Sequence, residues 1–176
     1  MSGDSRPKTK GAASTSARLG AIKMVALDVD GVLTDGRVWI SSTGDDALEF
    51  DIKDGMSITL LLDAGIEVAL ISGRKSGAVI HRAKALGIKK VRVGEKDKLG
   101  VLKELIKEAG CSRDEVAFVG DDLADLEPMR AVGLAVAVAD AVGEVKDAAH
   151  LILRKEGGRG AVRELAEKIL SKRRKR

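Results

Sequence analysis

The feature that most constrains the fold of this chain is a regular alternation of short apolar runs with longer amphipathic segments. Five mainly apolar runs have the length of buried strands: 22–27, 68–71, 91–93, 116–119 and 134–138. Between them, apolar residues recur three or four positions apart, as on the buried face of a helix. Strands that alternate with helices indicate a parallel sheet covered by helices. The sequence therefore predicts an α/β fold with a doubly wound, Rossmann-like parallel sheet.

One stretch departs from this alternation. Between Gly36 and Asp51, the runs 37–41 and 47–50 flank a Ser-Thr-Gly-Asp-Asp turn, a pattern that predicts a β-hairpin. The stretch is too short to form a domain over the edge of the sheet. We therefore expect a short hairpin flap, no cap domain, and a site that is open or is closed by another subunit.

Charge is distributed unevenly along the 176 residues. The net formal charge is +4, but residues 1–19 and 172–176 together carry more positive charge than that, so the middle of the chain is mildly acidic. Charged runs without apolar residues do not offset their own ordering entropy. We expect a disordered basic lead (1–19), one folded domain (20–170) and a basic tail (171–176).

Several classes of partner are disfavoured by composition. Only 2% of the residues are aromatic, which argues against a base-stacking nucleic-acid surface. A single cysteine, Cys111, permits no internal disulfide, and no apolar run has the length of a membrane span. The sequence predicts a cytoplasmic protein with neither nucleic-acid nor membrane partners.

The candidate chemistry begins directly after the first predicted strand, where Asp28 and Asp30 flank Val29. Parallel α/β sheets bind ligands at the carboxyl ends of their strands. Two carboxylates at this place repel each other, which implies a cation, and an oxygen-preferring ion such as Mg²⁺ fits them. Gly31 allows a sharp turn with backbone N–H groups directed at an anion.

Other predicted strand ends carry compatible groups. Ser72 and Gly73 follow one strand and are suited to hold a phosphate, while Lys98 begins the helix after the next strand. Asp121 follows a further strand and completes a metal site. A lone Asp-x-Asp is more often a structural turn, and Asp35 and Asp125 have capping or turn roles as alternatives. The combination at successive strand ends favours a catalytic phosphoryl-transfer site.

These motifs resemble those of the haloacid dehalogenase superfamily, and the residues around them resemble its 3-deoxy-D-manno-octulosonate 8-phosphate phosphatase family. The resemblance covers residues 23 to about 170. The narrower likeness is carried by Asp-Gly-Val-Leu-Thr-Asp-Gly (30–36), Ile-Ser-Gly-Arg (71–74), Gly-Asp-Asp-Leu (120–123) and Gly-Gly-Arg-Gly-Ala-Val-Arg-Glu (157–164).

The resemblance implies a phosphoric monoester hydrolase that forms an aspartyl-phosphate on Asp28 and uses Asp30 as general acid and base. It implies Mg²⁺ held by the Asp28 carboxylate, the Asp30 carbonyl and Asp121, and a substrate that supplies lipopolysaccharide biosynthesis. Ser72 and Lys98 would hold the phosphoryl group. The family is also tetrameric and capless, so the hairpin and the glycine-rich segment near the C-terminus would help to close a neighbour's site.

Substrate contacts are expected at Gly55, Arg74 and Arg159. The resemblance implies the first two. The guanidinium groups of Arg74 and Arg159 suit a sugar-acid carboxylate, and a solvent-exposed loop charge is an equally open interpretation of Arg159.

Three other functions compete with this interpretation. A phosphatase for a nine-carbon sugar-acid phosphate, such as deaminoneuraminate 9-phosphate, would share every motif. A signalling receiver domain also combines acidic residues, a hydroxyl and a lysine, but places its phosphoacceptor after a later strand. A catalytically silent oligomerisation module is disfavoured because every expected catalytic group is present.

Overall fold

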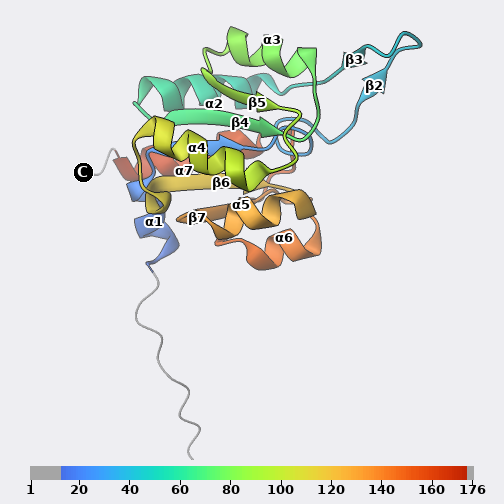
Figure 1. Cartoon of the computed structure of the whole chain (residues 1–176). Helices are drawn as coiled ribbons and strands as arrows, with labels where there is room; N and C mark the ends of the chain where they lie inside the picture. Colours follow the sequence, from blue (N-terminus) through green and yellow to red (C-terminus); the bar gives the residue numbers. More distant parts are fainter. Residues whose placement is uncertain (1–12, 174–176) are drawn as a thin grey trace, which may run out of the picture.

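The structure is a computed structural model of the chain, and it describes residues 13–173 (Figure 1). Six parallel strands form one sheet in the order β5-β4-β1-β6-β7-β8. Their bounds are β1 Met24–Leu27, β4 Glu67–Ser72, β5 Lys90–Val93, β6 Val116–Gly120, β7 Leu134–Ala137 and β8 Leu151–Ile152. The first five confirm the predicted strands, whereas β8, only two residues long, was not predicted.

Helices cover both faces of the sheet, so the predicted doubly wound fold is confirmed. Figure 1 shows α4 in front of the sheet and α2 and α7 behind it. The helices are α1 Thr15–Ala21, α2 Ile52–Asp63, α3 Gly77–Ala85, α4 Lys98–Ala109, α5 Leu126–Arg130, α6 Gly143–Ala148 and α7 Ala161–Arg173, with short 3₁₀ turns η1 Arg113–Glu115 and η2 Leu123–Asp125.

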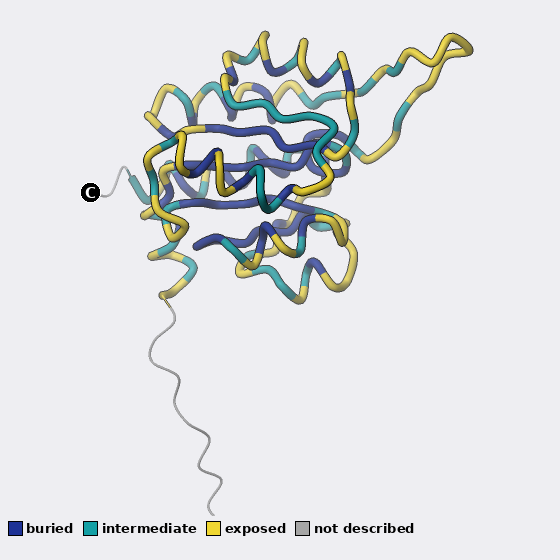
Figure 2. Tube along the Cα trace, in the orientation of Figure 1, coloured by how far each residue is buried: buried dark blue, intermediate teal, exposed yellow. Residues whose placement is uncertain are grey.

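The core lies between these two helical layers and is built almost entirely from aliphatic side chains. Figure 2 shows the central strands buried along their length. Every residue of β1 is buried, because β4 and β6 flank it and helices cover both of its faces. Strand order reverses on either side of β1, and this is the point where open parallel sheets form a ligand crevice.

The predicted hairpin is present, but its strands are shorter than expected. Strand β2 spans Trp39–Ile40 and pairs antiparallel with β3, Asp46–Ala47. Ser41, Thr43 and Asp45 bond to one another and form the turn, while residues 37–38 and 48–50 do not pair. The hairpin projects from the body beyond α3 (Figure 1), and no cap domain covers the site within residues 13–173.

The expectation of a disordered lead over residues 1–19 is wrong for its last part. Helix α1 begins at Thr15, with the Ser14 side chain accepting a hydrogen bond from the Ala17 N–H. Leu19 is buried in the core, and α1 packs against α7. Arg18 also donates to the Gly133 carbonyl and Thr15 to the His150 carbonyl, so side-chain contacts with distant residues hold a segment that composition alone made look like a tail. Residues 1–12 lie outside the described part of the chain.

The predicted basic tail also begins later than expected. Helix α7 continues to Arg173, whose guanidinium donates to the carbonyl groups of Ala64 and Ile22. These bonds dock the last described turn onto the ends of α1 and α2. Residues 174–176 lie outside the described residues. Within 13–173, each helix is too short or too polar to cross a membrane.

Candidate active site

The loop that follows β1 places Asp28 and Asp30 at the carboxyl edge of the sheet. Asp28 extends the strand, with its N–H donating to the Val119 carbonyl at 3.0 Å. The buried Thr34 hydroxyl then accepts from the N–H groups of Gly31 and Gly36, at 3.3 and 3.2 Å, and closes the loop. These local bonds hold the loop compact, so that both aspartates remain over the strand end.

Gly31 is the residue that lets this loop approach the loop after β6. Its φ is +89°, a left-handed conformation that suits glycine. A Cβ atom at this position would lie 2.0 Å from a carboxylate oxygen of Asp121. The close approach of the two loops therefore requires the absence of a side chain at Gly31.

Lys98 joins the two sides of the site. It is the first residue of α4, and its ammonium lies 2.8 Å from Asp28 Oδ1 and 2.8 Å from Asp125 Oδ1. All three side chains are buried or nearly so. Burial opposes the charged form of Lys98, but the two carboxylates outweigh that effect and raise its pKa.

Asp125 has a structural role that sequence reasoning left open. Its second oxygen accepts from the backbone N–H of Asp121 at 3.0 Å and more weakly from that of Asp122. Both of its oxygens therefore already have partners in the protein. Asp125 orients Lys98 and the Asp121 loop, and its spacing of four residues from Asp121 across a 3₁₀ turn was the available signal.

Asp121 is the group that most clearly fits a cation. Carboxylate oxygens of Asp28, Asp121 and Asp125 lie within 4.8 Å of one another. Within the described residues, the buried Asp121 Oδ1 has no hydrogen-bond partner. Desolvation, followed by repulsion from Asp28 and Asp125, raises the pKa of Asp121 to about 8. A buried acceptor among carboxylates suits a hard divalent cation, and Asp28 and Asp121 have the oxygens free to hold one.

The pKa of Asp28 is also raised, but less than that of Asp121. Desolvation by burial and the charge of Asp125 raise its pKa to about 6, while the Lys98 ammonium opposes the increase. The Asp28 carboxylate is therefore ionised near neutral pH. An ionised carboxylate beside a buried ammonium has the charge state that a nucleophile requires.

Asp30 lies across the pocket and contacts a different cation. Its Oδ1 is 2.6 Å from Arg74 Nη2, and the Ser72 hydroxyl lies 3.4 Å from its Oδ2. Ser72 is the last residue of β4 and is fully buried, with its Oγ also accepting from the Arg74 N–H. The ends of β1 and β4 are thus linked through these three side chains.

The structure brings most of the predicted site residues into one open pocket. Those that line it are Asp28, Asp30, Gly73, Arg74, Lys98 and Asp121, together with Gly36, Asp122, Ala124 and Asp125. Ser72 reaches the same place through its bond to Asp30. The carboxyl ends of β1, β4 and β6 and the start of α4 thus supply one site, as the sequence predicted.

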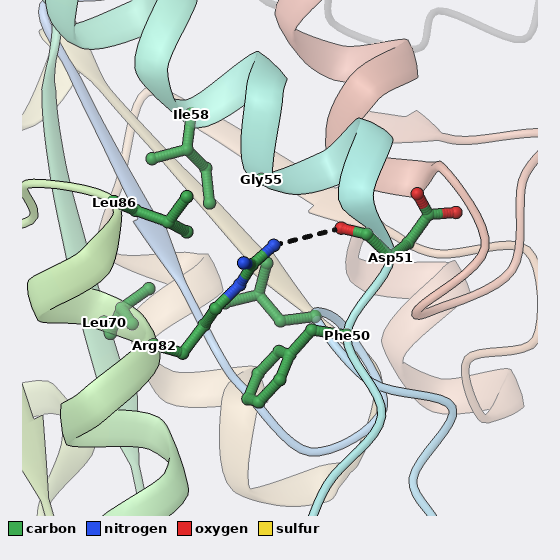
Figure 3. A pocket seen from close by; sticks show the side chains of 8 residues that line it. Phe50, Asp51, Gly55, Ile58, Leu70, Arg82 and Leu86 are labelled. Carbon is green, nitrogen blue, oxygen red and sulfur yellow. Dashed lines mark hydrogen bonds between the residues drawn. The ribbon is translucent and has the colours of Figure 1, made fainter.

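Gly55 and Arg159 lie outside this pocket. Gly55 is in α2 and faces a separate small cavity next to α3, where the Arg82 guanidinium lies between α2 and the Phe50 ring (Figure 3). A Cβ at Gly55 would overlap Arg82, so this glycine makes room for the arginine. Arg159 is mostly exposed and pairs with Asp35 at 3.4 Å, near the loop of Asp30. Substrate contact by either residue remains a prediction.

The glycine-rich segment before α7 packs against the loop that follows β1. Gly158 donates its N–H to the Val32 carbonyl at 2.9 Å, and a Cβ at Gly157 would lie 1.7 Å from the Gly31 carbonyl oxygen. Asp140 accepts from the Gly157 N–H at 2.9 Å. Gly157 and Gly158 thus pack against the loop of their own chain, and closure of a neighbour's site by this segment stays a prediction.

Asp54 fixes the other end of the same segment. This buried residue of α2 accepts from the N–H groups of Gly160 and Arg163, at 3.1 and 2.7 Å, and so caps the start of α7. Desolvation raises the pKa of Asp54 above its ordinary value, although the backbone hydrogen bonds oppose the increase. A carboxylate at a helix N-terminus is favoured by the exposed N–H groups and the helix dipole.

A doubly wound sheet with paired aspartates after its first strand and a buried lysine opposite them defines the class of haloacid dehalogenase-like hydrolases. A family profile with that description matches residues 94–165. The matched part contains Lys98, Asp121 and the glycine-rich segment.

Relatives over nearly the whole chain are more specific. The 3-deoxy-D-manno-octulosonate 8-phosphate phosphatases of Yersinia pestis and Haemophilus influenzae are 41% and 42% identical to this chain. Both alignments cover 87% of it, and 82% and 85% of those proteins. The chain therefore belongs to the 3-deoxy-D-manno-octulosonate 8-phosphate phosphatase family.

Solved structures agree with this assignment. The 3-deoxy-D-manno-octulosonate 8-phosphate phosphatase of Moraxella catarrhalis, in complex with magnesium, phosphate and the sugar acid, matches with a TM-score of 0.88 at 38% identity, covering 90% of this chain and 91% of that one. A cobalt-bound enzyme from Haemophilus influenzae matches with a TM-score of 0.88 at 41% identity, covering 90% and 92%. Residues 13–173 of this chain contain no cap domain.

The raised pKa of Asp121 predicts how the metal-free protein responds to pH. The folded value, about 8, exceeds the ordinary 3.8, so this group's contribution to stability is fully present below pH 3.8 and is lost as pH rises toward 8. With a chelator present, the free energy of unfolding in urea should fall between about pH 5 and about pH 8. The slope should be smaller in Asp121→Asn. An unchanged slope in that variant would contradict the shift.

The close contact of Gly157 predicts that Gly157→Ala is destabilising. An added methyl group must displace the Gly31 carbonyl, and overpacking of this kind costs about 1–3 kcal/mol of unfolding free energy. Gly143→Ala is the matched control, because a Cβ there has no neighbour within 4 Å among the described residues. Urea titration measures both variants, and equal stability would exclude the supporting role of Gly157.

Proposed function

We propose that this chain hydrolyses 3-deoxy-D-manno-octulosonate 8-phosphate in the presence of Mg²⁺ and releases the free sugar acid and phosphate. The observation that carries the proposal is the single pocket in which Asp28, close to Asp121, pairs with Lys98, while Asp30 pairs with Arg74. This pocket contains both the groups needed for phosphoryl transfer and a guanidinium that can bind a carboxylate. Relatives named for this activity support the choice of substrate.

In the first step of the proposed reaction, a carboxylate oxygen of Asp28 attacks phosphorus and the bond from phosphorus to the sugar oxygen breaks. Asp30 gives its proton to the departing sugar oxygen. In the second step Asp30 takes a proton from water, the water oxygen attacks phosphorus, and the aspartyl-phosphate bond breaks. The covalent intermediate divides one slow hydrolysis into two faster steps, and Asp28 is regenerated.

Neutralisation of charge is the main requirement of this reaction, because a phosphate dianion repels a carboxylate. The Lys98 ammonium, 2.8 Å from Asp28, supplies one positive charge from within the protein. Asp28, Asp121 and the Asp30 carbonyl would hold Mg²⁺, which when bound offsets the negative charge of carboxylate and phosphate together. Ser72 and Gly73 at the end of β4 would donate hydrogen bonds to the phosphoryl oxygens.

Arg74 is the proposed contact for the carboxylate of the sugar acid. It lines the pocket from the β4–α3 loop, and a guanidinium can bind a carboxylate through two parallel hydrogen bonds. Gly55 and Arg159 remain weaker proposals for substrate binding, since both lie outside the pocket in this chain. We further propose that the enzyme is cytoplasmic and that its product enters lipopolysaccharide biosynthesis, as family membership implies.

We also propose that the chain forms a homotetramer through its hairpin. Trp39 and Ile40 are 73% and 72% exposed at the projecting strand β2. Large apolar side chains gathered on a projecting element indicate an interaction surface. The hairpin is therefore a better candidate for contact between subunits than the glycine-rich segment, which is already packed against its own chain.

The substrate proposal is tested by measuring phosphate release with Mg²⁺ from a panel of sugar phosphates. We expect the eight-carbon sugar-acid phosphate to have the highest kcat/KM, and Asp28→Asn to lose activity by roughly a thousandfold or more because the nucleophile is gone. A higher value for the nine-carbon deaminoneuraminate 9-phosphate would assign the alternative substrate.

The control variant for this experiment is Asp63→Asn, at the end of α2 that lies at the opposite edge of the sheet. It removes the same formal charge and should leave turnover unchanged. Retained turnover in Asp28→Asn would remove Asp28 as the nucleophile, while loss of activity in both variants would show an effect of charge alone.

The tetramer proposal is tested by light scattering on size-separated protein. Wild type should have the mass of four chains, and Trp39→Asp should have a lower mass, because a carboxylate would be buried in the apolar contact. Ile152→Asp is the matched control, since Ile152 is an exposed residue of the edge strand β8 and belongs neither to the hairpin nor to α3, which contacts the hairpin. A monomeric wild type, or a tetrameric Trp39→Asp, would refute the hairpin interface.

A further inference from the structure

Arg74, the proposed contact for the substrate carboxylate, already has two carboxylate partners in this structure. Its Nη2 donates to Asp30 at 2.6 Å and its Nη1 donates to Asp46 at 2.5 Å. All three side chains are partly exposed at the mouth of the pocket. One positive charge is thus shared between two negative charges before any substrate arrives.

Asp46 comes from the hairpin and joins it to the body of the molecule. It is the first residue of β3, and hydrogen bonds from Ser76 and Arg74 lower the pKa of its carboxyl group. The other polar contacts of the turn, among Ser41, Thr43 and Asp45, run within the hairpin. The position of the hairpin is therefore linked to the side chain of Arg74.

A third carboxylate cannot bind Arg74 while both partners keep their bonds. With substrate bound, Asp46 and the carboxylate of the substrate would both be negatively charged at hydrogen-bond distance from one guanidinium, and like charges at that separation repel. One partner must give way. Asp30 is held near the strand end by the compact loop of Thr34, and it also has the Ser72 hydroxyl as a neighbour. Asp46 also has a hydroxyl neighbour, Ser76, but it belongs to a strand of two residues on a projecting hairpin and is the partner that can move.

We propose that Asp46 is a specificity-determining residue, an internal competitor that the carboxylate of the substrate must displace from Arg74. The inference rests on the proposed function and adds a role for the hairpin in substrate binding. Arg74 is held in place by Asp46 before substrate binds, and the hairpin contact is exchanged for the sugar acid during binding. A phosphate ester without a carboxylate leaves the Asp46 contact intact.

Removal of the competitor should strengthen the binding of carboxylated ligands and leave others unchanged. Partly exposed ion pairs contribute modestly, so the expected gain is about two- to fivefold. In Asp46→Asn, KM for the eight-carbon sugar-acid phosphate should fall by that factor, while KM for an aryl phosphate that lacks a carboxylate should not. The free sugar acid should also inhibit aryl phosphate hydrolysis at concentrations lower by about two- to fivefold.

The matched control is Asp45→Asn. Asp45 is the neighbouring residue, carries the same charge, and bonds to Thr43 within the turn instead of to Arg74. It therefore reports the effect of removing one negative charge from the hairpin. The ratio of KM values for the two substrates should change in Asp46→Asn and stay at the wild-type ratio in Asp45→Asn.

Two outcomes would overturn the inference. A rise in KM for the sugar-acid phosphate in Asp46→Asn would show that Asp46 orients Arg74 for the substrate, and equal changes for both substrates would show a general charge effect. Failure of the proposed function gives a different result, since wild type would then hydrolyse the aryl phosphate but not the eight-carbon ester. The inhibition measurement uses aryl phosphate turnover, so it tests Asp46 in that case as well.

Discussion

The ammonium of Lys98 lies between the carboxylates of Asp28 and Asp125 at 2.8 Å from each, and the rest of the site is arranged around these contacts. An unpaired charge at this depth would cost several kcal/mol, so the three side chains need one another to be buried at all. Asp125 also accepts from the Asp121 N–H. The start of α4 and the loops after β1 and β6 are thereby held in one relative position, and the cation site forms where they meet.

Backbone contacts without side chains support this arrangement. The loop after β1 is pressed against the Asp121 loop on one side and against Gly157 on the other, at distances that leave no room for a methyl group. Asp54 caps α7, and thus α2 and α7 fix the segment that carries Gly157. The C-terminal helix therefore contributes both to the core and to the shape of the site, although none of its side chains line the pocket.

The part of the pocket that faces solvent is organised differently. Arg74 and its partners Asp30 and Asp46 are partly exposed, and one of the two carboxylates comes from a hairpin with strands of two residues. Charges at the buried end are fixed by packing, whereas those at the open end can exchange partners at low cost. Phosphoryl transfer needs the first property, and binding and release of the substrate carboxylate need the second, so the division suits the proposed reaction.

The sequence by itself determined the fold class and most of the site, because alternation of strands and helices places all parallel strand ends at one edge. Asp28, Asp30, Ser72, Lys98 and Asp121 could be grouped from that rule alone. Only the tertiary structure showed that Asp125 pairs with Lys98 and that Asp46 pairs with Arg74. It also showed that Gly55 lies beside Arg82 and that residues 15–19 belong to a helix. Those outcomes depend on which side chains meet across loops and between distant segments, and spacing along the chain carries no record of such contacts.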